Sequence, residues 1–367
     1  MTLEIIILSV IVSAACAICG VFLLLRKMAL MSDAVSHSII LGIVIGFFIS
    51  KSLSSVIPIV GAVFAGLLSV MFTEFLKKTK LVKSDAAIAL VFPAMFSAGV
   101  ILVSLYAGNI HLDTDAVLLG EIGLAPLDRI EIFSLSIPRS TFVMGIILLI
   151  NVTLTVLFFK ELKVSAFDKS FAKSLGFSPT AMNYGLMTVV SVTCVGAFDS
   201  VGVVLVTALM IAPAAAALLL SDDLKTVIIL AVIVASISSV SGFFVADKID
   251  GSIAGAMATM CGVFFFIIYL FSPKHGLIRR NIMRQKLKMD FALQNLTVHI
   301  LNHSGTEEEP YECRADHLTE HINWTKAKAK KICNRARHLG LVEINNGFLS
   351  LLPKGLELAE NTLKMNR

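Results

Sequence analysis

The chain has 367 residues, of which 56% are hydrophobic and 16% are charged, and its mean hydropathy is +0.86. A soluble globular domain carries about 25% charged residues, so this composition excludes an ordinary water-soluble enzyme and predicts an integral membrane protein. The net charge of +5 arises in the C-terminal part, because residues 279–367 hold 15 basic and 10 acidic side chains and the remainder holds 16 of each.

Nine apolar runs predict a polytopic membrane domain over residues 1–278, because each run approaches the roughly 20 residues that a helix needs to cross a bilayer. The predicted spans cover residues 3–25, 30–50, 56–76, 86–106, 141–159, 183–198, 200–220, 225–245 and 251–271. The first run lacks a preceding basic region and a cleavage site, so we expect a retained span. Residues 196–200 leave room only for a tight turn or a broken helix, which gives eight or nine spans.

The distribution of basic residues predicts the topology. Lysine and arginine clusters follow the first, third, fifth and ninth spans, and all of them fall on one side if the spans alternate. The positive-inside rule makes that side cytoplasmic. We therefore expect an outer loop over residues 107–140, which is rich in acidic residues, and a cytoplasmic segment over residues 272–367.

Residues 285–367 are predicted to form a small soluble domain, because the composition becomes polar after the last span. We expect helices at 290–303, 314–322, 325–339 and 353–365, with a hairpin at 342–351 that turns at Asn346-Gly347. This order is that of a winged-helix domain. The predicted fold class is therefore an all-α polytopic membrane protein with a small C-terminal cytoplasmic α+β winged-helix-like domain.

Asp33 and His37 near the start of the second span are the strongest candidates for a metal site. Their spacing of four residues places both side chains on one helix face. A carboxylate at membrane depth costs about 2.5–3.5 kcal/mol, so it normally faces the bundle interior and has a function. The pair suits a divalent ion such as Mn²⁺, Zn²⁺ or Fe²⁺. A capping aspartate and an interfacial histidine form the alternative interpretation.

The segment 167–176 is predicted to be a short amphipathic helix with a glycine C-cap. Such a helix is too short to be stable alone, so it needs a partner surface. The sequence has no G-x-x-x-x-G-K-[ST] phosphate-binding motif. We therefore expect that this chain is not an enzyme and that any ATP hydrolysis takes place in a separate cytoplasmic subunit, to which this helix docks.

Two features of the C-terminal segment suggest ligands. Six basic residues between 326 and 337 give one helix a positive field that suits nucleic-acid phosphates or anionic lipid headgroups. The pairs His299/His303 and His317/His321 have the i,i+4 spacing that is compatible with metal binding, although histidines on exposed helix faces are common.

Five motifs occur in order along the chain. They are residues 25–37 (LRKMALMSDAVSH), 84–92 (SDAAIALVF), 167–176 (FDKSFAKSLG), 201–216 (VGVVLVTALMIAPAAA) and 271–276 (FSPKHG). With them the chain resembles, over residues 10–278, the membrane permeases of ABC importers for manganese, zinc and iron. The segment 247–251 (DKIDG) departs from the family pattern by lacking a proline, and residues 285–367 are an extension similar to winged-helix domains of metal-dependent repressors.

The resemblance implies a permease subunit in a bacterial cytoplasmic (inner) membrane that imports a divalent ion as substrate and holds no permanent cofactor. Its implied partners are an ATP-binding-cassette ATPase, an extracytoplasmic metal-binding protein and a second permease copy or paralogue. In this family an aspartate and a histidine of the second helix line the metal pathway, and the matching residues here are Asp33 and His37. The coupling helix carries over onto residues of the third motif, namely Phe167, Asp168, Ala172, Leu175 and Gly176.

Two other functions remain open at this point. A membrane-tethered, metal-responsive transcription regulator would need nucleic acid to bind residues 285–367. A secondary transporter would need further intramembrane carboxylates, of which the sequence shows few. The absence of a thiolate beside Asp33 and His37 argues against Cu(I), whereas Mn²⁺, Zn²⁺ and Fe²⁺ all suit the pair.

Overall fold

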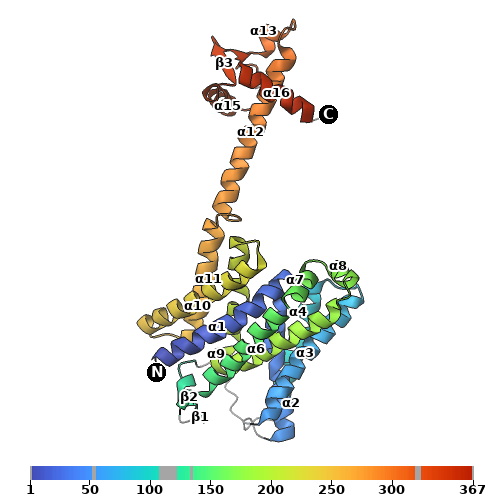
Figure 1. Cartoon of the computed structure of the whole chain (residues 1–367), viewed down its shortest axis with the longest axis vertical. Coiled ribbons are helices and arrows are strands. Elements are labelled where there is room, and N and C mark those ends of the chain that lie inside the picture. Colours follow the sequence, from blue (N-terminus) through green and yellow to red (C-terminus); the bar gives the residue numbers. More distant parts are fainter. Residues whose placement is uncertain (1, 52–54, 107–121, 133–134, 319–323, 366–367) are drawn as a thin grey trace. The chain divides into compact units, whose positions relative to one another are not determined.

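The computed structural model describes residues 2–51, 55–106, 122–132, 135–318 and 324–365. The chain divides into two compact units, Met1–Gly276 and Leu277–Arg367, and Figure 1 traces both. In its described residues the first unit is helical apart from one small hairpin, and the second unit combines helices with a two-stranded sheet. Each unit is described by itself below.

The membrane unit contains the predicted spans. Within the described residues, nine helical segments are long and apolar enough to cross a bilayer. They are α1 (Thr2–Leu25), α2 (Leu30–Ser50), α3 (Val56–Lys78), α4 (Ser84–Tyr106), α6 (Arg139–Leu157), the two parts of α9 (Pro179–Leu220), α10 (Leu224–Ile249) and α11 (Ile253–Phe271). The prediction of an all-α polytopic membrane protein is therefore confirmed.

Helix α1 is the most buried span of the bundle, and it packs against α6, α9 and α10 (Figure 1). Polar side chains in its surroundings bond to one another. Asn151 of α6 donates from Nδ2 to Thr193 Oγ1 of α9 at 2.9 Å and to the Ala15 carbonyl of α1 at 3.3 Å. Ser13 Oγ lies 2.5 Å from Ser239 Oγ of α10. Such bonds are needed because hydrocarbon offers no water to satisfy buried polar groups.

The interruption between the sixth and seventh spans lies at Gly202. Residues 196–200 stay helical, so the tight turn that their composition predicts is not formed. Helix α9 instead breaks where Gly202 adopts φ 76° and ψ 167°. A side chain rarely tolerates this conformation, and glycine adopts it freely because it has no Cβ. The broken helix is the correct alternative for this segment.

The segment between α4 and α6 belongs largely to the predicted outer loop, of which residues 107–121 and 133–134 lie outside the described residues. The described part contains a short 3₁₀ turn (Ala125–Leu127) and the antiparallel strands β1 (Arg129–Ile132) and β2 (Leu135–Pro138). Arg129 Nη2 donates to Glu4 Oε1 at 3.0 Å, which ties this hairpin to the start of α1.

The 271–276 motif forms a group of ion pairs and hydrogen bonds at the end of α11. Lys274 Nζ lies 2.8 Å from Asp222 Oδ2, and His275 Nε2 lies 3.2 Å from Asp222 Oδ1. The Lys274 hydrogen bond, followed by that of His275, lowers the pKa of the Asp222 carboxyl. Ser272 Oγ donates to the Leu219 carbonyl at 2.5 Å. These contacts therefore fasten the end of α11 to the junction of α9 and α10.

The C-terminal unit builds its own core around Leu296, Ile300, Leu318, Ile332 and Leu349. Its elements are α12 (Leu277–His303), α13 (Glu309–Glu312), α15 (Lys326–His338), β3 (Val342–Asn345), β4 (Phe348–Leu351) and α16 (Pro353–Met365). The predicted hairpin is present, and Asn346 and Gly347 take the positive φ angles of 49° and 81° that its two-residue turn requires.

The sequence prediction fails between α12 and α15. The expected loop 304–311 contains the start of α13, because Pro310 fits the first turn of a helix. The expected helix 314–322 does not begin at Arg314, which instead forms an isolated bridge with Phe348. Helical conformation appears only at Leu318, and residues 319–323 lie outside the described part of the chain. The winged-helix interpretation remains a prediction.

Helices α2 and α3 approach closely through glycines. A Cβ added to Gly42 would collide with the backbone of Gly61 and Ala62, and a Cβ on Gly46 would lie 2.6 Å from Pro58 Cα. This packing of small residues lets two helix backbones touch within a membrane. It fixes α2, and therefore the candidate metal ligands on it, against α3.

We predict that Gly42→Ala lowers the stability of the membrane unit by about 1–3 kcal/mol, because the added methyl group overpacks the α2–α3 contact. Gly145→Ala on α6 is the matched control, since a Cβ there meets nothing within 4 Å. Thermal unfolding of both variants in detergent would measure the difference. Equal midpoints for the two variants would contradict the close contact.

Candidate functional site

Asp33 and His37 face each other across the first turns of α2. His37 Nε2 lies 3.4 Å from Asp33 Oδ1. The N-cap of α2 is Ala29, which provides no side-chain capping bond, and Asp33 lies beyond it inside the helix. The alternative interpretation of Asp33 as a capping residue is therefore wrong. The pair presents one oxygen and one nitrogen in the same place.

Aromatic rings of α4 hold the His37 imidazole. The Phe92 ring lies 5.6 Å from it in a tilted arrangement, and the Phe96 ring lies 5.6 Å away edge-on. The side chains of His37 and Asp33 keep 22% and 37% of their surface exposed. The imidazole is therefore oriented by packing, and the pair still has an open side at which an ion can approach.

The Asp33–His37 pair supplies two candidate metal-ligand atoms within one chain. Protein-bound divalent ions take four or more ligands. Among the residues that the structure describes, the group of three potential metal ligands is His299, His303 and Glu312 in the C-terminal unit, not a group on α2. A metal ion at Asp33 and His37 therefore needs ligands from water or from another chain.

A pocket of about 490 Å³ lies between α2, α3, α6 and α9. Its wall is mainly apolar, with Ile39, Ala62 and Val192 among its residues, and the ion pair of Asp128 and Arg139 lies at its margin, 3.7 Å apart. Asp33 and His37 do not line it. The structure thus places the candidate ligands on a different face of α2 from this pocket.

The predicted coupling segment 167–176 begins at the last residue of α7 (Phe159–Phe167), passes Asp168 and forms the short helix α8 (Lys169–Ser174). Asp168 Oδ1 caps α8 by accepting hydrogen bonds from the Ser170 and Phe171 amides at 2.8 and 3.0 Å. Gly176 ends the segment with φ 85°, where a residue with a side chain would be strained. The sequence therefore builds a helix with both ends defined.

Three apolar side chains of this segment lie exposed and four residues apart: Phe167, Phe171 and Leu175, with 65%, 54% and 51% of their surface accessible. Ala172 is completely buried. Sequence reasoning included Ala172 among the docking residues and omitted Phe171. The i,i+4,i+8 spacing of Phe167, Phe171 and Leu175 was the sequence signal that could have identified Phe171.

Arg26 connects this segment to the rest of the bundle. Its guanidinium donates to Ser165 Oγ of α7 at 2.8 Å and to Asn183 Oδ1 of α9 at 3.1 Å. Asn183 Nδ2 in turn donates to Glu74 Oε1 of α3 at 2.6 Å. Arg26 lies between α1 and α2, so these bonds join α7 to the junction from which the Asp33 helix starts.

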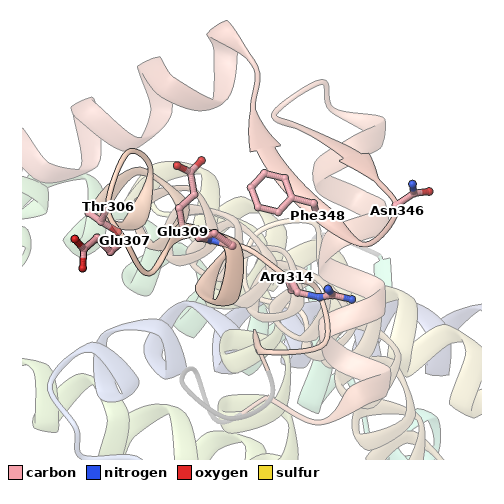
Figure 2. Close-up of a pocket in the computed structure, with 7 residues that line it drawn as sticks. Thr306, Glu307, Glu309, Arg314, Asn346 and Phe348 are labelled. Carbon is pink, nitrogen blue, oxygen red and sulfur yellow. The ribbon is translucent and has the colours of Figure 1, made fainter.

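The C-terminal unit contains the remaining predicted candidates. The basic side chains of α15 are exposed, and Lys328 Nζ lies 5.6 Å above the Trp324 ring. A pocket of about 310 Å³ lies beside the β3–β4 turn. Figure 2 draws residues that line it, among them Glu309, Arg314 and Phe348. His299 and His303 come together with Glu312, whereas His321 lies outside the described residues.

The described helices define a polytopic membrane protein, and the sequence comparisons identify its family. A sequence model described as the ABC 3 transport family matches residues 1–272. The chain belongs to this family. Residues beyond 272, including the whole C-terminal unit, lie outside the matched part.

Named relatives and a solved structure agree with this assignment. The chain is 59% identical over 366 residues to the zinc transport system membrane protein TroD of Treponema pallidum, with both chains covered completely. It is 40% identical to the manganese transport system membrane protein MntD of Bacillus subtilis, over 77% of this chain and 96% of that one. PsaBC from Streptococcus pneumoniae has a TM-score of 0.64 and 26% identity, over 76% and 94% of the two chains.

We predict that Asp168→Ala frays α8, because the variant removes both capping bonds at its N-terminus. An N-cap contributes about 1 kcal/mol, which corresponds to roughly fivefold faster amide hydrogen exchange in residues 169–174. Asp168→Asn, which keeps an acceptor oxygen, should exchange like the wild type. The interpretation of Asp168 as a cap would be contradicted if the asparagine and alanine variants exchanged equally fast.

Proposed function

We propose that this chain is the permease subunit of an ABC importer that carries Mn²⁺, Zn²⁺ or Fe²⁺ into the cytoplasm. The observation that carries the proposal is the Asp33–His37 pair on α2, with 3.4 Å between its ligand atoms and an open side. The names of the relatives, which are zinc, manganese and iron transport proteins, support a transition metal as the substrate. Oxygen and nitrogen ligands suit such ions.

A second permease copy or a paralogue completes the site in this proposal. Two-fold symmetry brings the same surface of two chains together, so two Asp33–His37 pairs would supply two carboxylates and two imidazoles. Four such ligands satisfy a tetrahedral ion, and water molecules can extend the shell. The partial exposure of Asp33 and His37 in the single chain supports this arrangement, because a partner surface can reach them.

The direction of transport follows from the orientation that the basic clusters favour. An extracytoplasmic metal-binding protein would deliver the ion to the outer face. The end of the bundle that bears Arg26, α7 and α8 would face the cytoplasm, together with the C-terminal unit. The pair then releases the ion inward by alternating access, and no covalent chemistry takes place on this chain.

The exposed apolar residues of α7 and α8 are the proposed docking surface for a separate ATPase subunit. Phe167 ends α7, Phe171 lies in α8 and Leu175 follows it, and each of these side chains is more than half exposed on a segment that Asp168 and Gly176 hold in shape. Movement of this segment would reach the start of α2 through the hydrogen bonds of Arg26 to α7 and α9. ATP hydrolysis would in this way change the surroundings of Asp33.

We predict that Asp33→Ala and His37→Ala each reduce metal uptake at least tenfold, because loss of a ligand weakens a metal site by about that factor or more. Uptake is measured in proteoliposomes with the partner subunits, and Mn²⁺, Zn²⁺ and Fe²⁺ are offered separately. The ion whose uptake is lost identifies the substrate.

Asp85→Ala is the matched control for this experiment. Asp85 lies in the first turn of α4, as Asp33 lies in the first turn of α2, and it is exposed. This variant should transport like the wild type. Normal uptake by inserted Asp33→Ala and His37→Ala proteins would reject the site.

We predict that Leu175→Ala, alone and with Phe171→Ala, weakens ATPase binding and lowers metal-stimulated ATP hydrolysis several-fold, because it removes apolar side chains from the docking surface. The readouts are co-purification of the ATPase and its hydrolysis rate.

Leu127→Ala is the control, since Leu127 has 64% of its surface exposed on the opposite, predicted outer, side of the bundle. Equal loss of ATPase binding in both leucine variants would contradict the docking surface. The Asp33 site would be unaffected by that result.

A further inference from the structure

Three potential metal ligands converge in the C-terminal unit. His299 and His303 lie one turn apart at the end of α12, and Glu312 ends α13. One ligand atom from each of these residues lies within 4.8 Å of the other two. The separation is small enough for a single ion to contact all three after minor side-chain adjustment. Both elements belong to the same compact unit, so the cluster needs no contribution from the membrane unit.

The cluster is largely shielded from water. The side chains of Glu312 and His299 are only 10% and 13% exposed, and that of His303 is 26% exposed. Glu312 Oε2 lies 3.7 Å from His299 Nε2, and the two histidine rings are 4.8 Å apart between centroids. A shielded carboxylate is costly unless a positive charge accompanies it, and a divalent cation between these groups supplies that charge.

His317 lies beside Glu312 but outside the group of three whose ligand atoms are within 4.8 Å of one another. Its Nδ1 lies 3.7 Å from Glu312 Oε2, and its side chain is 20% exposed. The Tyr311 ring packs against the His317 ring at 5.1 Å and limits its rotation. Three imidazoles and one carboxylate form a ligand set that suits tetrahedral Zn²⁺ or Co²⁺.

The surrounding structure supports a bound ion in two ways. Glu308 Oε2 lies 3.4 Å from His303 Nδ1, and a carboxylate on one ring nitrogen commonly orients an imidazole that binds metal through the other. The Gly305 amide donates to Glu309 Oε2 at 2.7 Å, which holds the connection between α12 and α13 in place. An ion would join the two ends of this short connection.

The neighbouring thiol does not belong to the ligand set. Cys313 is completely buried, and its Sγ faces the Ile300 carbonyl at 4.0 Å, toward the core of the unit.

We propose that the C-terminal unit binds a divalent transition-metal ion through His299, His303 and Glu312, with His317 as the fourth ligand. This site is separate from the Asp33–His37 pair, and its existence does not depend on the proposed transport function. A nitrogen-rich set follows the usual affinity order of divalent metals, so we expect Zn²⁺ and Co²⁺ to bind more tightly than Mn²⁺.

Co²⁺ titration of the full-length protein in detergent tests the proposal. The Asp33→Ala/His37→Ala double variant is used as the starting protein, so that the membrane pair cannot contribute. The expected result is one bound Co²⁺ per chain, with the intense visible bands of a tetrahedral site and no thiolate charge-transfer band. Zn²⁺ should displace the Co²⁺.

Glu312→Gln and His303→Gln, introduced into that double variant, should weaken Co²⁺ binding by at least about tenfold. His338→Gln is the control, because His338 is an exposed histidine at the end of α15 in the same unit. A second measurement guards against misfolding. Zn²⁺ should slow amide hydrogen exchange across residues 299–317 in the double variant, while Glu312→Gln should keep the metal-free exchange pattern without responding to Zn²⁺.

Three results would overturn the proposal. Undiminished Co²⁺ binding by Glu312→Gln would show that the cluster is only a hydrogen-bonded group, in which His299 Nε2 donates to the Glu312 carbonyl at 3.2 Å. Equal loss in His338→Gln would indicate non-specific histidine binding. A thiolate charge-transfer band would assign a cysteine to the site. The transport experiments on Asp33 are independent of all three results.

Discussion

The pairing of Asp33 with His37 is the constraint on which the rest of the structure depends. A bilayer disfavours a carboxylate in a membrane helix unless a partner and a function accompany it. The structure provides a partner at 3.4 Å and aromatic rings of α4 that orient the imidazole. Two ligand atoms do not complete a metal site, so in the proposed function a second chain or water supplies the remaining ligands.

The remaining architecture holds this pair and joins the start of its helix to α7 and α9. Glycines such as Gly42 bring α2 and α3 into backbone contact, which fixes the helix that carries the ligands. Arg26, just before that helix, bonds to α7 and α9. Helix α8 then presents exposed Phe171 on the surface of the unit. Hydrogen-bonded groups thus connect α7, which contacts α8, to the start of α2, and the proposed docking surface lies at that end.

Features set by local sequence patterns were predicted well, whereas contacts between segments distant in the sequence were not predicted. Apolar runs located the membrane helices, and Asn346-Gly347 located the hairpin turn. The break at Gly202 was placed a few residues early, because five turn-forming residues gave a stronger local signal than one glycine. The spacing of four residues placed Asp33 beside His37 correctly, whereas the burial of Ala172 could be seen only in the fold. The spacing of His299 and His303 could be seen in the sequence, whereas Glu312 reaches them through α13, which the sequence did not predict.

The most direct test of the central claim is the position of the transported ion itself. Crystals or vitrified particles of the assembled transporter, loaded with Mn²⁺ or Zn²⁺, would show the ion by anomalous scattering or by density. The account predicts an ion within bonding distance of an Asp33 oxygen and a His37 nitrogen, completed by ligands from a second permease chain or water. An ion on the transport path that contacts neither residue, with the Asp33–His37 pair empty, would contradict it.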